Sequence, residues 1–285
     1  MSIVIPCFNA VADLPGQLDA LARQDTSELF EVIVSDNGST DGLAGFIVEE
    51  AARLPYQIRR VDASQRRGVA HARNVGCAAA RAQTILICDA DDVVEPGWVQ
   101  AMVSALATAD LVGGTLVSDG INSEVVRQWR PMYRAGDLPR KLGHLGYAVG
   151  ANTGLRREVF EALGGWDVGF VAGGDDVEFS WRAQHAGFTL AAAPDAVIRY
   201  RLRPSLRTTM RQSYAYARSD AQLLQAFRSA GVRRTSLRSP WWEVRWLARN
   251  VRGLVRAGSR GLWLRRAAMF AGRISGSVKY RAWAV

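Results

Sequence analysis

An apolar run that ends in a cluster of acids, Thr84 to Asp92 (TILICDADD), constrains this 285-residue chain more than any other segment. Residues Thr84 to Cys88 are typical of a buried β-strand, whereas three carboxylates within the next four positions resist burial and repel one another. A cation relieves that repulsion, and such oxygens suit Mg2+ or Mn2+, which also bind phosphate. The alternative is a solvated turn before a helix that begins near Glu95 and Pro96.

Short apolar runs alternate with helical patterns through the first part of the chain. The predicted strands cover residues 2–8, 31–35, 57–61, 84–88 and 110–117. Between them, apolar residues recur every three or four positions, which is typical of helices that connect parallel strands. The predicted fold class is therefore α/β, with a doubly wound, mostly parallel sheet flanked by helices.

Polar side chains follow four of these predicted strands at the point where each one ends. Asn9 follows the first strand, and Asp36, Asp62 and Asp89 follow the next three. Because ligands of such sheets bind beyond the carboxyl ends of the strands, we expect these groups to share one site. No glycine-rich phosphate loop or dinucleotide fingerprint follows the first strand, which disfavours P-loop NTPases and dehydrogenases.

Residues 173–178 (GGDDVE) predict the start of a helix. Asp175 and Glu178 have the spacing of a capping box, which leaves Asp176 in the first turn, where it can act as a general base. Residues 36–42 (DNGSTDG) similarly predict a turn followed by a helix with Asp41 as its N-cap.

Residues 68–76 (GVAHARNVG) place Arg73 and Asn74 in a helical stretch that opens with a glycine. A helix N-terminus with a nearby arginine suits a phosphate, although core packing beside a surface arginine is an equally simple interpretation. Residues 118–150 follow no clean period and carry Trp129, Arg130, Tyr133, Arg134, Arg140 and Lys141, so we expect a long functional loop there.

The charge is divided unevenly along the chain. Residues 1–195 hold 25 acidic and 16 basic residues, whereas residues 196–285 hold 2 acidic and 20 basic residues. In the basic part, Arg245, Arg249, Arg252 and Arg256 recur at helical spacing opposite an apolar face, and five of the nine tryptophans lie nearby. This pattern predicts an amphipathic helix that binds an anionic membrane surface through residues 241–273, although a helix packed on the catalytic domain remains an alternative.

The compartment can also be predicted from composition. Cys7, Cys77 and Cys88 are odd in number and two lie in strand-like runs, so we expect reduced core thiols and a cytoplasmic protein. We see no signal segment and no apolar run of spanning length, which predicts a soluble or peripheral protein on the cytoplasmic face.

The order of the motifs resembles that of family 2 glycosyltransferases, inverting enzymes with the GT-A fold. The resemblance rests on SIVIPCFN, EVIVSDNGSTDG, GVAHARNVG, ILICDADD, ANTGLRREVFEALGGWD and GGDDVEFSWRAQHAG, and covers residues 1–204. It implies a GT-A catalytic domain over residues 1–204, with a nucleotide-sugar-binding part over residues 1–117 and an acceptor-binding part over residues 118–204. The charge and helical pattern of the remaining chain predict a basic helical extension over residues 205–285. It also implies transfer of a sugar from a nucleoside-diphosphate sugar to an acceptor hydroxyl, with a glycan or a lipid-linked saccharide as the acceptor.

The resemblance further implies a role for each matching residue. Asp176 takes the place of the catalytic base, and Asp91 that of the metal ligand. The implied nucleotide-sugar-binding residues are Pro6, Phe8, Asn9, Asp36, Asp62, Arg73, Asn74, Asp89 and Ala90. The implied acceptor-binding residues are Asn152, Trp166, Asp167 and Asp175.

One departure from the family pattern concerns the ligands of the implied metal site. Many members have a histidine ligand in the segment that reads Val197 to Arg201 here, and this segment has none. Either the metal is held more loosely, by Asp91, phosphates and water, or Arg199 or Arg201 replaces part of the charge of the histidine. Two other functions remain alternatives: a nucleotidyltransferase that makes nucleotide sugars, and a nucleic-acid-binding protein, which the acidic strand ends disfavour because they repel phosphate.

Overall fold

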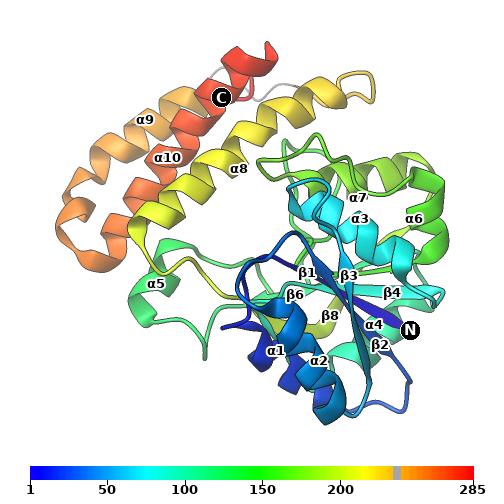
Figure 1. The fold of residues 1–285 in the computed structure, drawn as a ribbon. Helices are drawn as coiled ribbons and strands as arrows, with labels where there is room; N and C mark the ends of the chain where they lie inside the picture. Colours follow the sequence, from blue (N-terminus) through cyan, green and yellow to red (C-terminus); the bar gives the residue numbers. More distant parts are fainter. Residues whose placement is uncertain (234–238) are drawn as a thin grey trace.

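An eight-stranded sheet in the order β3-β2-β1-β4-β7-β6-β8-β5 forms the centre of the molecule (Figure 1). The computed structural model describes residues 1–233 and 239–285. The strands are β1 Ser2–Cys7, β2 Glu31–Asp36, β3 Gln57–Asp62, β4 Thr84–Cys88, β5 Val93–Val94, β6 Leu111–Val117, β7 Asn152–Arg156 and β8 Leu190–Arg199. Strands β1 to β4 pair in parallel, while β7 runs antiparallel to both β4 and β6, so the predicted mostly parallel sheet is confirmed.

Helices flank the sheet on both faces, as the alternation of apolar runs predicted. They are α1 Leu14–Ala22, α2 Leu43–Arg53, α3 Val69–Ala79, α4 Trp98–Leu106, α5 Glu124–Trp129, α6 Arg157–Leu163, α7 Asp175–His185, α8 Leu206–Ala226, α9 Ser239–Arg249 and α10 Ala257–Tyr280, with a 3-10 turn η1 at Val251–Val255. The side chains of β1 alternate between the two faces. Ile3 and Ile5 pack with α1, α2 and α4, whereas Val4 packs with α3, α6 and α7.

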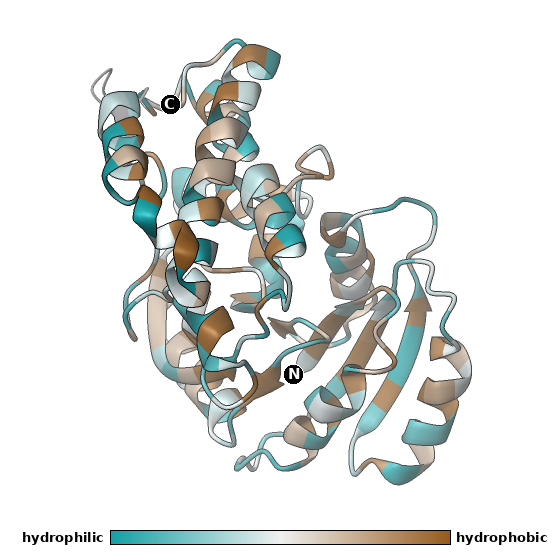
Figure 2. Ribbon diagram, turned by 90° about the vertical axis from the view of Figure 1, so that its left-hand side faces the viewer, coloured by the Kyte–Doolittle hydropathy of each residue, from teal (hydrophilic) through white to brown (hydrophobic). Residues whose placement is uncertain are grey.

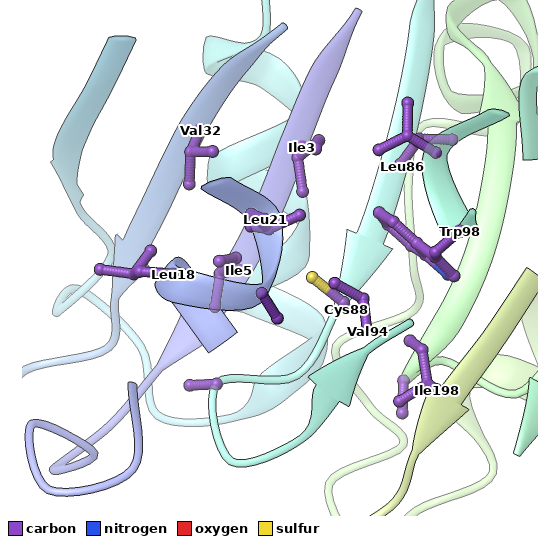
Figure 3. Packing of buried hydrophobic residues seen from close by; sticks show 14 of the residues in the cluster. Ile3, Ile5, Leu18, Leu21, Val32, Leu86, Cys88, Val94, Trp98 and Ile198 are labelled. Carbon is purple, nitrogen blue, oxygen red and sulfur yellow. The ribbon is translucent and has the colours of Figure 1, made fainter. Parts of the chain in front are cut away.

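The larger core lies on the α1 and α4 side of the sheet (Figure 3). Leu18 and Leu21 of α1 and Trp98 of α4 are buried there against the strands. Cys7, Cys77 and Cys88 are buried and unpaired, as expected for core thiols. Apolar residues are concentrated in the strands, while the C-terminal helices carry polar and apolar residues side by side (Figure 2).

The C-terminal helices α8, α9 and α10 lie together beside the sheet (Figure 1). Gly272 and Gly276 bring α10 so close to α8 that a side chain at either position would meet backbone oxygens of Tyr214 or Arg218. Within residues 1–233 and 239–285, no helix has an apolar stretch long enough to cross a bilayer.

The sequence predicted one continuous amphipathic helix that carries four arginines, and this prediction is wrong because the segment is broken into three elements. Helix α9 ends at Arg249, η1 contains Arg252, and Arg256 is the N-cap of α10. The break follows Asn250 and includes Gly253, two residues with low helix propensity, and it lets α10 fold back along α8.

Two predicted helix caps are also wrong. Gly174, in the left-handed conformation with φ of 86°, is the N-cap of α7, so Asp175 makes no capping box with Glu178. Gly42 is the N-cap of α2, because Asp41 instead accepts a hydrogen bond from the Val11 amide across the loops. Both carboxylates are therefore available for contacts outside their own helices.

Candidate active site

A cavity of about 770 Å3 lies between the carboxyl edge of the sheet and helices α8 and α10. Four predicted site residues line it: Arg73, Asp89, Asp175 and Asp176. They come from three separate sequence motifs, on α3, after β4 and at the start of α7. The fold thus brings into one cavity the carboxylates and the arginine that the sequence only suggested were related.

Three carboxylates after β4 form the strongest candidate metal centre among the described residues. Ligand oxygens of Asp89, Asp91 and Asp92 lie within 4.8 Å of one another. Burial raises the pKa of Asp91 and Asp92, and repulsion from Asp89 raises both further. The buried Oδ2 of Asp92 has no hydrogen-bond partner, while its Oδ1 accepts from the Arg201 amide at 2.7 Å. A divalent cation fits this set, because it satisfies the free oxygen and offsets the repulsion.

Arginines after β8 surround these acids where a histidine was expected. Nη1 of Arg203 lies 3.3 Å from Oδ2 of Asp91, and Nε of Arg201 donates to the Asp91 carbonyl at 2.7 Å. Arg199 instead pairs with Glu95. Part of the prediction is therefore wrong: Arg203, which was not considered, reaches the Asp91 carboxylate, and Arg199 does not.

Arg73 occupies the centre of a buried ionic network. Its Nη1 lies 2.6 Å from Oδ2 of Asp175, and its Nη2 lies 3.4 Å from Oδ1 of Asp89. Burial raises the pKa of Asp175 to about 6, although the Arg73 charge opposes this shift. With a 4% exposed side chain bound to a buried carboxylate, Arg73 holds the start of α7 against the end of β4.

Asp176 has a different environment from its neighbour. It is only partly buried, lines the cavity, and accepts hydrogen bonds from the backbone amides of Val177 at 2.9 Å and Gly150 at 3.3 Å. No basic side chain forms an ion pair with it among the described residues. Its carboxylate is held in place by the backbone and is open to a molecule in the cavity, as a general base requires.

A second group of predicted residues lies along the ends of β1, β2 and β3, outside the cavity lining. Burial raises the pKa of Asp36, but hydrogen bonds from Ser39 and Arg60 overcome this effect and leave the pKa below its usual value. Asp62 is the register partner of Asp36 and is exposed.

The loop after β1 completes this edge. Asn9 adopts a left-handed conformation (φ 51°), and its Oδ1 accepts from the Thr40 amide at 2.8 Å. Phe8 is 48% exposed, and the Arg67 guanidinium lies 4.4 Å from the centre of its ring. Pro6 lies near the end of β1. An aromatic ring, an amide and two carboxylates therefore share one edge of the sheet.

Two of the predicted acceptor-binding residues are wrong on structural grounds. Asn152 is fully buried, and its side chain bonds the carbonyls of Thr115 and Ala196 and the indole of Trp98. Trp166 is 3% exposed and stacks on Phe179 at 4.0 Å between ring centroids. Both side chains are committed to the core, so an acceptor cannot reach them.

Three further predicted residues have local contacts outside the cavity lining. Asp167 is exposed, and its carboxylate accepts from the Gly169 amide at 2.7 Å. Asn74 exchanges hydrogen bonds with the backbone of Trp166, and thereby fixes the loop before α7. Ala90 is buried between the acidic residues of the β4 loop.

Several cavity residues were missed because their segments carry no motif. Arg203 and Tyr216 come from the region after β8, and Arg265 and Arg273 come from α10. The irregular segment 118–150 does supply part of the lining, through Arg130, Tyr133, Arg140, Lys141 and Tyr147. Its unusual density of arginine and aromatic residues was the available signal, whereas helical packing alone brings α10 to the cavity.

Comparison with known proteins decides the family. Residues 2–164 match the family described as Glycosyl transferase family 2, and residues 84–274 match Glycosyl transferase family group 2. The chain belongs to glycosyl transferase family 2. The predicted resemblance is confirmed, and the match extends beyond residue 204 into the basic C-terminal helices.

Curated members of this family show partial similarity. The chain is 30% identical over 230 residues to validoxylamine A glucosyltransferase of Streptomyces hygroscopicus subsp. jinggangensis, covering 69% of this chain and 54% of that protein. It is 25% identical over 207 residues to glycosyltransferase AglE of Haloferax volcanii, covering 72% of this chain and 67% of that protein. The chain thus spans about half the length of the first of these relatives.

Two solved structures share the fold of this chain over nearly its whole length. Mannosyltransferase PcManGT from Pyrobaculum calidifontis, solved in complex with GDP-Man and Mn2+, matches with a TM-score of 0.68 at 20% identity, covering 98% of this chain and 86% of that one. S. aureus TarS 1-349 in complex with UDP matches with a TM-score of 0.55 at 15% identity, covering 98% and 90%. The GT-A-type sheet and the C-terminal helices are therefore shared architecture.

Proposed function

We propose that this protein is an inverting glycosyltransferase that moves a sugar from a nucleoside-diphosphate sugar to an acceptor hydroxyl. The observation that carries the proposal is the position of Asp176, which faces the same cavity as Asp89 while its neighbour Asp175 is neutralised by Arg73. One carboxylate is therefore free to take a proton, and Asp89 of the acidic cluster after β4 lines the same cavity.

The nucleoside half of the donor is proposed to bind along the ends of β1 to β3. Phe8 offers an exposed ring for the base, Asp36 carries acceptor oxygens for its edge, and Asp62 and Asn9 lie beside them. Pro6 pairs with Ser35 of β2 at this edge, and Asn74 on α3 and Ala90 after β4 are proposed to support the bound nucleotide from the neighbouring elements. Relatives bind GDP-Man and UDP, so guanine and uracil nucleotides are the first donors to test.

The diphosphate is proposed to lie between this edge and the cavity. Asp91, with Asp89 and Asp92 beside it, would hold Mg2+ or Mn2+, and the Mn2+ in the PcManGT complex supports this choice of cofactor. When bound, such an ion neutralises charge on the departing diphosphate. Arg203, beside Asp91, adds a second positive charge on the same side.

The reaction proposed at Asp176 is a direct displacement. Its carboxylate takes the proton from the acceptor hydroxyl, the oxygen attacks the anomeric carbon, and the bond to the nucleoside diphosphate breaks with inversion of configuration. Arg73 anchors Asp175 and so holds the start of α7, where Asp176 lies, and the Gly150 and Val177 amides fix the orientation of the Asp176 carboxylate.

A test of the base assignment replaces Asp176 by Asn, which keeps the shape but can accept from only one of the two backbone amides. Transfer should fall by about two to four orders of magnitude, while binding of the nucleoside diphosphate with Mn2+ stays within twofold. The exposed Asp25→Asn variant is the matched control and should remain fully active. Near-normal turnover of Asp176→Asn would show that the base lies elsewhere. Release of pyrophosphate instead of a nucleoside diphosphate would indicate a nucleotidyltransferase.

A peripheral position on the cytoplasmic face of a membrane is proposed for residues 241–273. Trp241 and Trp242 are 76% and 63% exposed, and Arg245, Arg249 and Arg252 lie in the same segment, although α9, η1 and α10 divide it. Exposed indoles beside arginines suit the headgroup region of an anionic bilayer. Flotation with anionic liposomes, but not with neutral ones or DNA, is the expected result. A protein that binds DNA and no liposome would contradict it.

A further inference from the structure

Two arginines on the wall of the cavity come from opposite sides of a helix contact. Arg130 follows α5, and Arg265 lies on α10. The contact is tight, because Nε1 of Trp129 donates to the Ala257 carbonyl at 3.1 Å and a side chain at Gly261 would overlap the Trp129 indole. Arg265 follows Gly261 by one helical turn, so this packing places both guanidinium groups at the same end of the cavity.

These two arginines differ from the other cations around the cavity, apart from Arg140, which is exposed to solvent. Arg73, Arg203 and Arg273 each pair with an aspartate, at Asp175, Asp91 and Asp220. In the described part of the chain, neither Arg130 nor Arg265 forms an ion pair with a carboxylate.

The other contacts of Arg130 and Arg265 leave the positive charges of both guanidinium groups without a negative partner. The Arg130 guanidinium lies 5.0 Å from the centre of the Tyr200 ring, with Nη1 3.4 Å from its hydroxyl. The buried Nε of Arg265 has no hydrogen-bond partner. Burial and, next, the neighbouring charge of Arg130 together lower the pKa of Arg265 to about 10. An anion bound between the two guanidinium groups would offset both the cost of burying these charges and their mutual repulsion.

The pair and the proposed diphosphate site are made of different residues. Arg203 and Asp91 mark that site, whereas the hydroxyl of Tyr133 lies 3.5 Å from that of Tyr147, and both tyrosines line the cavity with Arg130 and Asp176. Burial and the Asp176 charge raise the pKa of Tyr147, while the Arg130 charge lowers it, so the tyrosine pair neighbours both the base and the arginine pair. An acceptor whose hydroxyl reaches Asp176 can therefore extend past these rings to Arg130 and Arg265.

We propose that Arg130 and Arg265 form a subsite for a phosphate group of the acceptor, which therefore carries a phosphate as well as the hydroxyl to be glycosylated. This proposal rests on the transferase function proposed above. Two guanidinium groups from separate elements suit a tetrahedral anion with more than one charge, whereas a carboxylate is matched by a single arginine fork. The phosphate can belong to a soluble sugar phosphate or to a lipid phosphate.

The test is calorimetric titration of glucose 1-phosphate into the full chain, with and without UDP or GDP and Mn2+. Binding should occur in both conditions, and glucose should show none. Arg265→Gln and, separately, Arg130→Gln should weaken binding at least tenfold. Arg23→Gln removes an equal charge outside the cavity and should leave binding unchanged. A second titration uses a polyprenyl phosphate in micelles, with the matching polyprenol as the control that lacks the phosphate. Tighter binding of the polyprenyl phosphate than of glucose 1-phosphate indicates a lipid acceptor, and the reverse order indicates a soluble one.

Three results would overturn the subsite. These are equal binding by wild type and both arginine variants, competition between glucose 1-phosphate and the nucleoside diphosphate, and equal affinity for glucuronate. Competition would assign the arginines to the donor, and glucuronate binding would assign them to a carboxylate. Failure of the proposed function is seen separately, as absence of nucleoside-diphosphate binding in the same titrations.

Discussion

Replacement of Arg73 by Gln removes the one cation from the network that joins α3, β4 and α7. The Asp175 carboxylate, 2.6 Å away and buried, then has no opposite charge, and Asp89 loses a second contact. Removing one partner of a buried ion pair costs about 3–5 kcal/mol, and at this chain length each kcal/mol lowers the melting temperature by about 2–4 °C. We therefore expect the melting temperature to fall by about 10 °C at pH 7.

The size of this effect should depend on pH. Burial has already raised the pKa of Asp175 to about 6, and loss of the Arg73 charge raises it further. A carboxyl whose folded pKa lies above its unfolded value binds its proton more tightly in the folded state, so stability falls as pH rises between the two values. Below the unfolded pKa both states are protonated and the penalty vanishes. Arg73→Gln should therefore be closer to wild type at pH 5 than at pH 8.

Thermal unfolding of Arg73→Gln, followed by circular dichroism across this pH range, measures both effects. The exposed Arg23→Gln variant is the charge-matched control and should change stability by less than about 0.5 kcal/mol. The double variant Arg73→Gln with Asp175→Asn should recover part of the loss, because no buried charge is then left alone. A loss below about 1 kcal/mol for Arg73→Gln, or a loss that is independent of pH, would refute the reasoning.

Three further predictions follow from single contacts. The pKa of Asp36 is lowered, so this carboxylate stabilises the fold above its unfolded pKa, and the stabilisation is lost as pH falls through its folded pKa. The difference in unfolding free energy between wild type and Asp36→Asn, measured by urea denaturation, should therefore shrink from pH 6 to pH 3. Gly272→Ala should destabilise by about 1–3 kcal/mol by thermal melting, because its methyl would meet the Tyr214 backbone, while Gly45→Ala in open space should not. Removal of divalent ions by EDTA should abolish transfer, and Mn2+ or Mg2+ should restore it; undiminished activity in EDTA would contradict the metal site.

The strands whose sequences are continuously apolar were predictable. β1, β2 and β4 were identified within a residue of their ends, because buried parallel strands carry such runs. β3 (QIRRVD) was placed equally well, although its only apolar residues are Ile58 and Val61. β7 and β8 were not predicted as strands. The first reads NTGLR, and its polar Asn152 is satisfied inside the core, while the second is rich in alanine and contains Pro194 beside a register shift. Tertiary pairing, and not local propensity, forms these two strands.

The site was predictable where a residue belongs to a motif at a strand or helix end, as for Asp89 and Asp176. It was not predictable where packing decides the direction of a side chain. Trp166 turns into the core because it stacks on Phe179, and Arg265 reaches the cavity because Gly261 admits the Trp129 indole. The basic C-terminal region was expected to serve a surface partner, yet part of it lines the cavity.

The stereochemistry of the reaction tests the central claim most directly. UDP-glucose, UDP-GlcNAc and GDP-mannose are offered with Mn2+, and the slow hydrolysis of whichever donor is accepted is followed by proton NMR before the free sugar mutarotates. The sugar released first should have the anomeric configuration opposite to that of the donor, and Asp176→Asn should suppress its formation. Release with retained configuration would contradict direct displacement assisted by Asp176.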